Sequence, residues 1–255
     1  MRRLALASAL AILGAPQNAW SQDAVADVLH VTGQATALPG ANTRAGGVEW
    51  LHPLSETATL DLGLFSGSGG GAWWTYARAG GVSRHERVIL SAMLDLGGGR
   101  VAGAPFPYRR LQGGVIVPLG TRRVFAEGEA LYVRMSTVAT YGLRAGTVVQ
   151  WTPRLAIRAS GHVLRSGSAV SPAVSARADL TRTRWQLMGG GFVSRQAASM
   201  PLPIEGGSVV QATRGAFVGA QVRAGRQHVM ATVDISQQLQ GRVTTLLMGV
   251  RIPIE

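Results

Sequence analysis

The 255-residue chain contains no cysteine and no lysine, so it forms no disulfide and all 25 of its basic residues are arginine. Charged residues make up only 15 % of the chain, against about 25 % in typical soluble domains. Aromatic residues make up only 6 %. Beyond residue 21, no apolar run approaches the length of about 18 to 20 residues that a membrane-spanning helix requires. These absences exclude a disulfide scaffold and a bundle of membrane-spanning helices, and they argue against an ordinary soluble domain.

The N-terminal segment has the pattern of an export signal. The chain starts with two arginines after Met1, continues with an apolar run over 4–14, and carries small residues at Ala19 and Ser21. A cationic start, a short apolar core and small residues at the cleavage site are typical of a secretory signal peptide. We therefore predict a signal peptide over 1–21. The absence of cysteine suits a chain that is exported into an oxidising compartment without needing disulfides.

Polar and apolar residues alternate with a period of two throughout 123–180. In the segment 141–151, for example, Leu143 falls on one side and Arg144 on the other, and the pattern restarts over 154–164 after a short turn. A period of two places alternate side chains on opposite faces of a strand. Helical periodicity is scarce, and 34 glycines are spread along the chain. The sequence thus predicts an all-β fold.

The same pattern predicts about fourteen strands, each long enough to cross a bilayer at a tilt. They cover 28–38, 44–51, 57–65, 72–82, 87–96, 108–117, four strands within 123–180, then 185–194, 209–223, 228–238 and 243–254. The uncertainty of strand boundaries allows twelve to sixteen strands. An even number places both ends of the chain on one side.

The connections between these strands are predicted to alternate in length. Short turns are expected at 53–56, 83–86, 118–122, 152–154, 181–184 and 224–226. Longer connections lie between them, and the two longest, 97–107 and 196–208, each contain two prolines. Short turns on one side and long loops on the other are typical of transmembrane barrels.

The two faces of the predicted strands differ in a way that favours a membrane. One face carries Leu, Val, Ile and Ala with almost no charge, and the other carries Gly, Ser, Thr and isolated charges. In hydrocarbon every backbone group must be paired, so a strand-built span must close into a barrel. Aromatic residues near strand ends are consistent with interfacial girdles. These residues are Trp50, Trp73, Trp74, Tyr108, Tyr132, Tyr141, Trp151 and Trp185.

The C-terminal segment resembles the terminal strand of bacterial outer-membrane β-barrels. Gly249 is followed three and five residues later by Ile252 and Ile254, although that family usually has aromatics there and a final Phe in place of Glu255. With the signal peptide, size and alternation, the whole chain resembles this class and is similar in length to the small YaiO-like barrels. The resemblance implies a single transmembrane antiparallel barrel over 22–255 in the outer membrane, in contact with lipid and lipopolysaccharide.

If the apolar faces meet lipid, the charged residues of the other faces line the lumen. This predicted lining contains the cations Arg110, Arg144, Arg158, Arg177, Arg223 and Arg251, the anions Glu49, Asp61, Asp95, Glu127, Glu129, Asp179 and Asp234, and also His162. Because the charges nearly balance, we expect cross-strand ion pairs: Glu127 or Glu129 with Arg144, and Arg158 or Arg177 with Asp179. Such pairs suit either a polar channel or a filled interior.

The formal net charge is +12, because arginines outnumber acidic residues. Since the predicted lining is nearly balanced, the arginines that cause this excess are expected in turns and loops. The arginines on the short-turn side are Arg84, Arg87, Arg122, Arg123, Arg154, Arg182, Arg184 and Arg226, and those on the other side are Arg100, Arg109, Arg134, Arg165, Arg195, Arg214 and Arg242. The first set suits headgroups or a periplasmic or polysaccharide-export partner, and the second suits lipopolysaccharide phosphates. The export signal, and the absence of a basic stretch interleaved with aromatics, argue against nucleic acid.

Signals for catalysis and cofactors are weak. The five histidines are scattered, no Gly-x-Ser-x-Gly motif occurs, and no metal-ligand spacing is present. Ser160 and His162 share a face of one strand, but no acid is placed beside them. The glycine runs 97–99 and 189–191 are followed by neither lysine nor a predicted helix, as a phosphate-binding loop would be. The sequence predicts no enzyme and no cofactor.

Three hypotheses of function follow. The first is a channel or porin-type conduit for a polar solute or an exported polymer such as a polysaccharide, narrowed by 97–107 and 196–208. The second is a non-conducting structural or adhesion barrel that binds through its loops. The third is a lipid hydrolase at the barrel rim.

Overall fold

A computed structural model describes residues 27–254, with gaps at 121–122, 198–209 and 239–240. The predicted signal peptide lies outside the described residues. Within them, every regular element is a β-strand. A search of the same residues finds no helix long and apolar enough to cross a bilayer.

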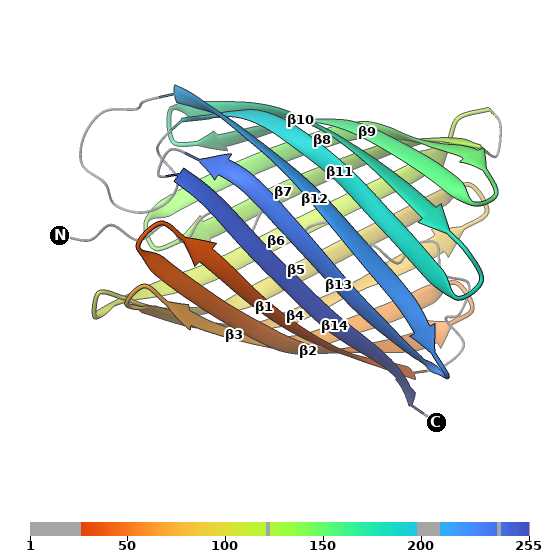
Figure 1. Cartoon of the computed structure of the whole chain (residues 1–255), viewed down its shortest axis with the longest axis horizontal. Coiled ribbons are helices and arrows are strands. Elements are labelled where there is room, and N and C mark those ends of the chain that lie inside the picture. The colour runs from red at the N-terminus through yellow and green to blue at the C-terminus, as the bar shows by residue number, and fades with distance from the viewer. Residues whose placement is uncertain (1–26, 121–122, 198–209, 239–240, 255) are drawn as a thin grey trace.

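Fourteen strands run along the chain (Figure 1), which confirms the predicted fold class and strand number. They are β1 (Asp27–Leu38), β2 (Ala41–Ser55), β3 (Ala58–Gly69), β4 (Ala72–His85), β5 (Val88–Val101), β6 (Ala104–Pro118), β7 (Val124–Met135), β8 (Val138–Thr152), β9 (Leu155–Ser166), β10 (Ala169–Thr181), β11 (Trp185–Ala197), β12 (Val210–Ala224), β13 (Gln227–Gln238) and β14 (Gly241–Ile254). Each pairs antiparallel with its neighbours in sequence.

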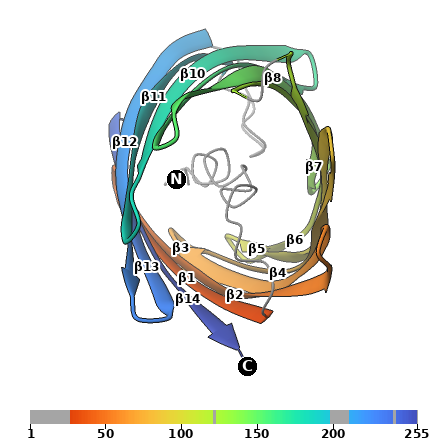
Figure 2. The ribbon, with the colours of Figure 1, turned by 90° about the vertical axis from the view of Figure 1, so that its right-hand side faces the viewer.

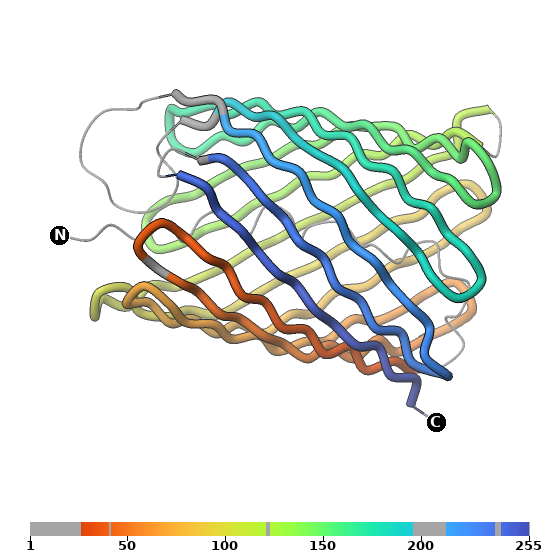
Figure 3. Tube along the Cα trace, viewed as in Figure 1, coloured from red at the N-terminus to blue at the C-terminus, as the bar shows by residue number. Residues whose placement is uncertain are grey.

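Pairing of the first strand with the last closes the sheet into a barrel. Asp27 of β1 lies opposite Ile254 of β14, and the two strands stay in register as far as Ala37 and Thr244. Closure leaves no unpaired sheet edge, as a bilayer requires. Figure 2 shows the ring of strands end-on, and the trace in Figure 3 shows that they are inclined to the barrel axis. The rim where β1 begins and β14 ends is called the terminal rim, and the other the opposite rim.

The expected contrast between short turns and long loops is wrong for the described connections. The predicted loop 97–107 is a hairpin in which β5 continues to Val101 and β6 begins at Ala104. Its turn consists of Ala102 and Gly103, both at positive φ. Glycine and proline misled the prediction, because in a closed wall glycine allows close strand packing and proline tolerates an extended backbone near a strand end. Of the second predicted loop, Gln196 and Ala197 belong to β11, and 198–208 lie outside the described residues.

Exposure along the strands is the reverse of that in a soluble protein. Leu64 and Leu143 point outward and are each 67 % exposed, whereas Asp95 and Arg110 on the inner face are 0 % and 4 % exposed. A soluble sheet would bury the leucines and solvate the charges. The pattern is that of a barrel whose outer wall meets hydrocarbon.

The aromatic residues divide between the two faces. Trp73 and Tyr141 point outward near the opposite rim, and Trp151 and Trp185 do so near the terminal rim. These positions match the expected girdles. Trp74 and Tyr108, also predicted as girdle residues, instead point inward. Strand parity decides this, because Trp74 follows Trp73 directly and must take the other face.

Candidate transport lumen

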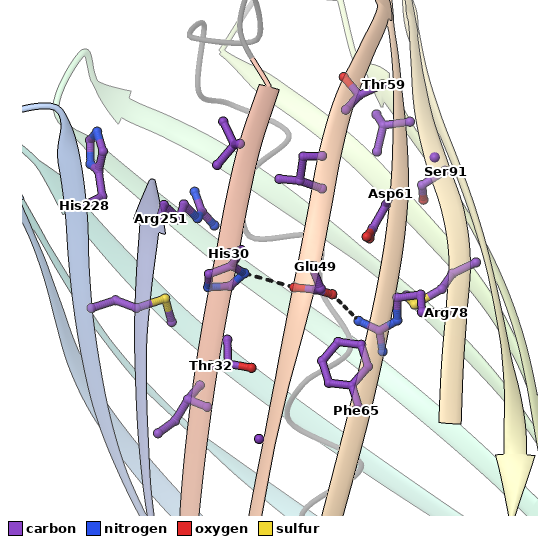
Figure 4. A pocket seen from close by; sticks show the side chains of 18 of the residues that line it. His30, Thr32, Glu49, Thr59, Asp61, Phe65, Arg78, Ser91, His228 and Arg251 are labelled. Carbon is purple, nitrogen blue, oxygen red and sulfur yellow. Dashed lines mark hydrogen bonds and ion pairs between the residues drawn. The ribbon is translucent and has the colours of Figure 1, made fainter. Parts of the chain in front are cut away.

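Arg78 of β4 is the centre of an ion-pair cluster on the inner wall. Its Nη1 donates to Glu49 Oε1 at 2.7 Å, and its Nε donates to Asp95 Oδ1 at 2.8 Å. His30 Nδ1 lies 2.9 Å from the other Glu49 oxygen, and the Arg78 guanidinium lies over the Phe65 ring at 4.6 Å. Figure 4 shows His30, Glu49, Phe65 and Arg78 converging from neighbouring strands. The cluster joins β1, β2, β4 and β5.

The cluster continues into β6. Arg110 Nη1 lies 3.9 Å from Asp95 Oδ2, and its Nη2 donates to Gln112 two residues along the same strand. Asp95 and Arg110 are directly opposite in the register of β5 and β6. Because the Asp95 side chain has no exposure to solvent, its charge is balanced by neighbouring side chains: Arg78 at 2.8 Å and, less closely, Arg110 at 3.9 Å.

A second cluster covers β7, β8 and β9. Arg144 Nη2 lies 3.2 Å from Glu129 and 3.9 Å from Glu127, and Arg158 Nε lies 3.2 Å from Glu127. The expected pairing of Arg144 with these glutamates is therefore present. Arg158, for which Asp179 was one expected partner, approaches Glu127 instead.

On β10 the ion pair lies within one strand. Arg177 Nη2 donates to Asp179 Oδ1 at 2.6 Å, and its Nε contacts both Asp179 oxygens at 2.9 Å. The two residues are separated by one position, so they share the inner face. With the two clusters described above, charged pairs extend over the inner wall from β1 to β10.

A cavity of about 480 Å³ lies against the inner wall on the side of β1 to β6 and β12 to β14. Four of the predicted residues line it, namely Glu49, Asp61, Arg223 and Arg251, and Figure 4 shows Glu49, Asp61 and Arg251 among its side chains. Asp61 Oδ1 has no hydrogen-bond partner among the described residues, and the same holds for Oδ2 of the buried Asp234 on β13. The cavity therefore presents an acidic acceptor next to basic groups.

The inner aromatic rings lie flat on glycines of the adjacent strand. Phe65 faces Gly47 across β3 and β2, and Phe192 faces Gly215 across β11 and β12. A Cβ built on Gly215 would lie 2.5 Å from the Phe192 ring. The rings occupy the space that the glycines leave, so they add to the wall and project less toward the barrel axis.

His162 takes part in a hydrogen-bonded group with two serines. Its Nε2 lies 3.0 Å from both Ser160 Oγ and Ser175 Oγ, and the two serine oxygens lie 2.9 Å apart. Among the described residues, no carboxylate forms an ion pair with His162, and Arg144 is its register partner on β8. A Ser-His-acid arrangement needs a carboxylate or amide that orients the histidine. The three side chains therefore form a hydrogen-bonded polar patch on the inner wall and lack the orienting group of a catalytic triad.

The predicted residues are therefore distributed over the inner wall, and their part in solute passage stays a prediction. The predicted lining omits Arg78, because the sequence analysis assigns no inner face to the strand predicted over 72–82. The signal was available: Trp74, Tyr76 and Arg78 share one parity, opposite to Ala77 and Ala79. The predicted lining also omits His30 and Gln112. No group of three metal-ligating side chains occurs in the described part of the chain.

Comparisons with known proteins identify the architecture. No family model and no curated protein matches the chain. A solved structure described as a bacterial polysaccharide outer membrane secretin is similar over 91 % of this chain and 99 % of its own, with a TM-score of 0.61 and 11 % identity. The CymD monoaromatic hydrocarbon channel is similar over 89 % of this chain and 87 % of its own, with a TM-score of 0.61 and 9 % identity. The Pseudomonas putida toluene transporter TodX is similar over 89 % of each chain, with a TM-score of 0.59 and 8 % identity. These likenesses confirm the predicted class of fold.

Proposed function

We propose that this chain, an outer-membrane β-barrel by its fold, resides in the bacterial outer membrane and is a passive conduit for polar solutes. The observation that carries the proposal is the ionic inner wall centred on Arg78, Glu49 and Asp95. Charged groups that face one another across a lumen offer donors and acceptors that replace the water around a polar solute. The proposed mature barrel covers 22–255, after removal of the predicted signal peptide.

The inner wall favours a polar over an apolar solute. An apolar molecule would displace water from Arg78, Asp61 and their neighbours without replacing the hydrogen bonds. Two of the similar structures are described as hydrocarbon and toluene carriers, but their likeness to this chain is one of fold. The ion pairs on the inner wall of this chain favour a polar solute instead.

Among polar solutes, we propose saccharides, either small or as an exported polymer. The cavity combines the aromatic rings of Phe65, Trp74 and Tyr76 with the charged groups of Glu49 and Arg78. Aromatic rings provide an apolar face for a sugar ring, while carboxylate and guanidinium groups bond to its hydroxyls. An exported polymer would require a partner at the terminal rim, where exposed arginines of the turns, such as Arg87 and Arg184, suit an acidic surface.

Single-channel recording of the refolded full chain in a planar bilayer tests conduction. We expect discrete conductance steps that disappear when the protein is heat-unfolded before addition. Conductance no higher than that of the bare bilayer over a range of salt concentrations would contradict the conduit. Vesicle swelling with neutral sugars and oligosaccharides of increasing size then tests the solute class. Equal swelling rates with and without the protein would contradict saccharide passage.

A non-conducting barrel is the second candidate, and one observation favours it. Phe106, Tyr108 and Met135 point inward, yet they are only 4–9 % exposed, so part of the inner wall is covered by other side chains. A filled interior would give a correctly folded barrel without conductance. Heat-modifiable gel migration, measured on the sample used for recording, separates this outcome from a failure to fold.

A further inference from the structure

Eight arginines form a collar on the outer surface near the opposite rim. They are Arg44, Arg100, Arg109, Arg134, Arg165, Arg195, Arg214 and Arg242. Each has the strand parity that points outward, each is exposed, and each lies within six residues of the strand end at that rim. Seven of them were predicted in loops. The structure corrects this by placing them on strands, where their side chains face the surrounding membrane.

Among the described residues, the collar has no acidic counterpart. No carboxylate of the described residues lies within ion-pair distance of any of the eight, and the acidic side chains of the strands face inward except Asp27, which pairs with His52 near the terminal rim. Within the described part of the chain, the collar donates two hydrogen bonds, both to backbone carbonyls: from Arg134 to Ser136 and from Arg165 to Gly167. Eight positive charges near one rim of the outer wall, with no acidic partner among the described residues, therefore call for an external anion.

Two collar residues on adjacent strands lie so that their like charges require an anion between them. Arg109 of β6 and Arg134 of β7 are directly opposite in the strand register, and both point outward. Like charges at directly opposite positions destabilise a sheet. A phosphate group between two guanidinium groups removes this repulsion and accepts hydrogen bonds from both.

A groove lies beneath another part of the collar. Arg214 and Arg242 flank Gln237 in the register of β12, β13 and β14. They border an open groove of about 800 Å³ on the barrel wall, whose lining includes the outward side chains of Val174, Val193 and Ile235. Apolar side chains of this kind suit acyl chains, and the two arginines suit phosphate at their head. The groove thus offers binding surfaces for both parts of a phosphorylated lipid, the acyl chains and the phosphate.

We propose that the arginine collar binds the phosphate groups of lipid A in lipopolysaccharide, with one acylated molecule seated at Arg214 and Arg242. The proposal rests on the proposed membrane location and is independent of conduction. It also assigns the orientation of the barrel: the opposite rim faces the cell exterior, and the terminal rim, where β1 begins and β14 ends, faces the periplasm. Arginine rather than lysine is suited to this site, because its planar fork binds phosphate through two parallel hydrogen bonds.

Native mass spectrometry of the refolded full chain in detergent tests the site. The probes are bisphosphorylated lipid A, the same lipid A without phosphates, and phosphatidylglycerol. We expect retention of bisphosphorylated lipid A, and at least about tenfold weaker retention of the other two, as the loss of charge-assisted hydrogen bonds implies. Equal retention of the dephosphorylated form would overturn the proposal, and equal retention of phosphatidylglycerol would overturn its assignment to lipid A.

Two double variants provide the matched comparison. Arg214→Gln with Arg242→Gln should weaken retention of bisphosphorylated lipid A about tenfold. Arg154→Gln with Arg182→Gln removes the same charge from exposed turns at the terminal rim and should leave retention unchanged. An equal loss in both variants would show a general charge effect and contradict the site. Heat-modifiable migration and conductance of the same samples show whether each variant is folded, so loss of lipid binding is distinguishable from failure of the conduit.

Discussion

Arg78 and Asp95 are joined by two hydrogen bonds, from Nε at 2.8 Å and from Nη2 at 3.3 Å, and the Asp95 side chain has no solvent exposure. They lie opposite one another on β4 and β5. A carboxylate removed from water in this way is stable only with a permanent cation beside it. The guanidinium of Arg78 provides that cation and also binds Glu49. Much of the polar wall therefore depends on one side chain.

Replacement of Arg78 by methionine should destabilise the barrel by about 3 kcal/mol, because it leaves a buried carboxylate with incomplete compensation. The measurement is urea-induced unfolding of the chain refolded in vesicles. Arg154→Met, in an exposed turn, is the control and should change stability by less than about 0.5 kcal/mol. Adding Asp95→Asn to Arg78→Met should restore part of the loss. A cost for Arg78→Met no larger than that of the control would show that the ion pair does not support the wall.

The aromatic rings that lie on glycines give a second prediction. Gly215→Ala places a methyl group 2.5 Å from the Phe192 ring and should cost about 1–3 kcal/mol through overpacking. The displaced ring should also lower the conductance. Gly161→Ala, on β9, meets no atom within 4 Å and should be close to neutral in both measurements. Equal effects of the two substitutions would indicate a general response to loss of strand glycine.

Charge at the cavity should control ion selectivity. Asp61 lines the cavity and has an oxygen without a hydrogen-bond partner among the described residues, so Asp61→Arg should shift the reversal potential in a salt gradient toward anion selectivity. Glu56→Arg makes the same change of charge in the exposed turn between β2 and β3 and should have a smaller effect. A larger shift from Glu56→Arg would mean that the rim, and not the cavity, selects the ions.

The group formed by Ser160, His162 and Ser175 should have no hydrolytic activity. His162 lacks an acidic partner among the described residues and faces Arg144, which opposes the positive charge that a general base must acquire. Fatty acid release from phospholipid vesicles should be equal for the wild type, for Ser160→Ala and for vesicles without protein. Release by the wild type that Ser160→Ala abolishes would establish the rim hydrolase instead.

The predicted lining could be read from strand parity, because successive side chains of a strand must take opposite faces. Parity assigns Asp95, Arg144 and Asp179 to the inner face but cannot select their partners. Arg158 approaches Glu127, two strands away, and Arg78 joins residues of β2 and β5. Which side chains reach each other depends on the tilt and stagger of strands in the closed barrel, and a pattern along one strand carries no such information.

The sequence by itself determined that the chain is a barrel of about fourteen strands with an apolar outer face, because the period of two and the requirement for backbone pairing in lipid leave no other architecture. Only the tertiary structure decided that 97–107 is a hairpin and that the outlying arginines lie on strands and form a collar. The physical reason is that strand ends are set by pairing with neighbours and not by local composition. A glycine or proline that would end an isolated strand stays in the wall when the strands on either side hold it there.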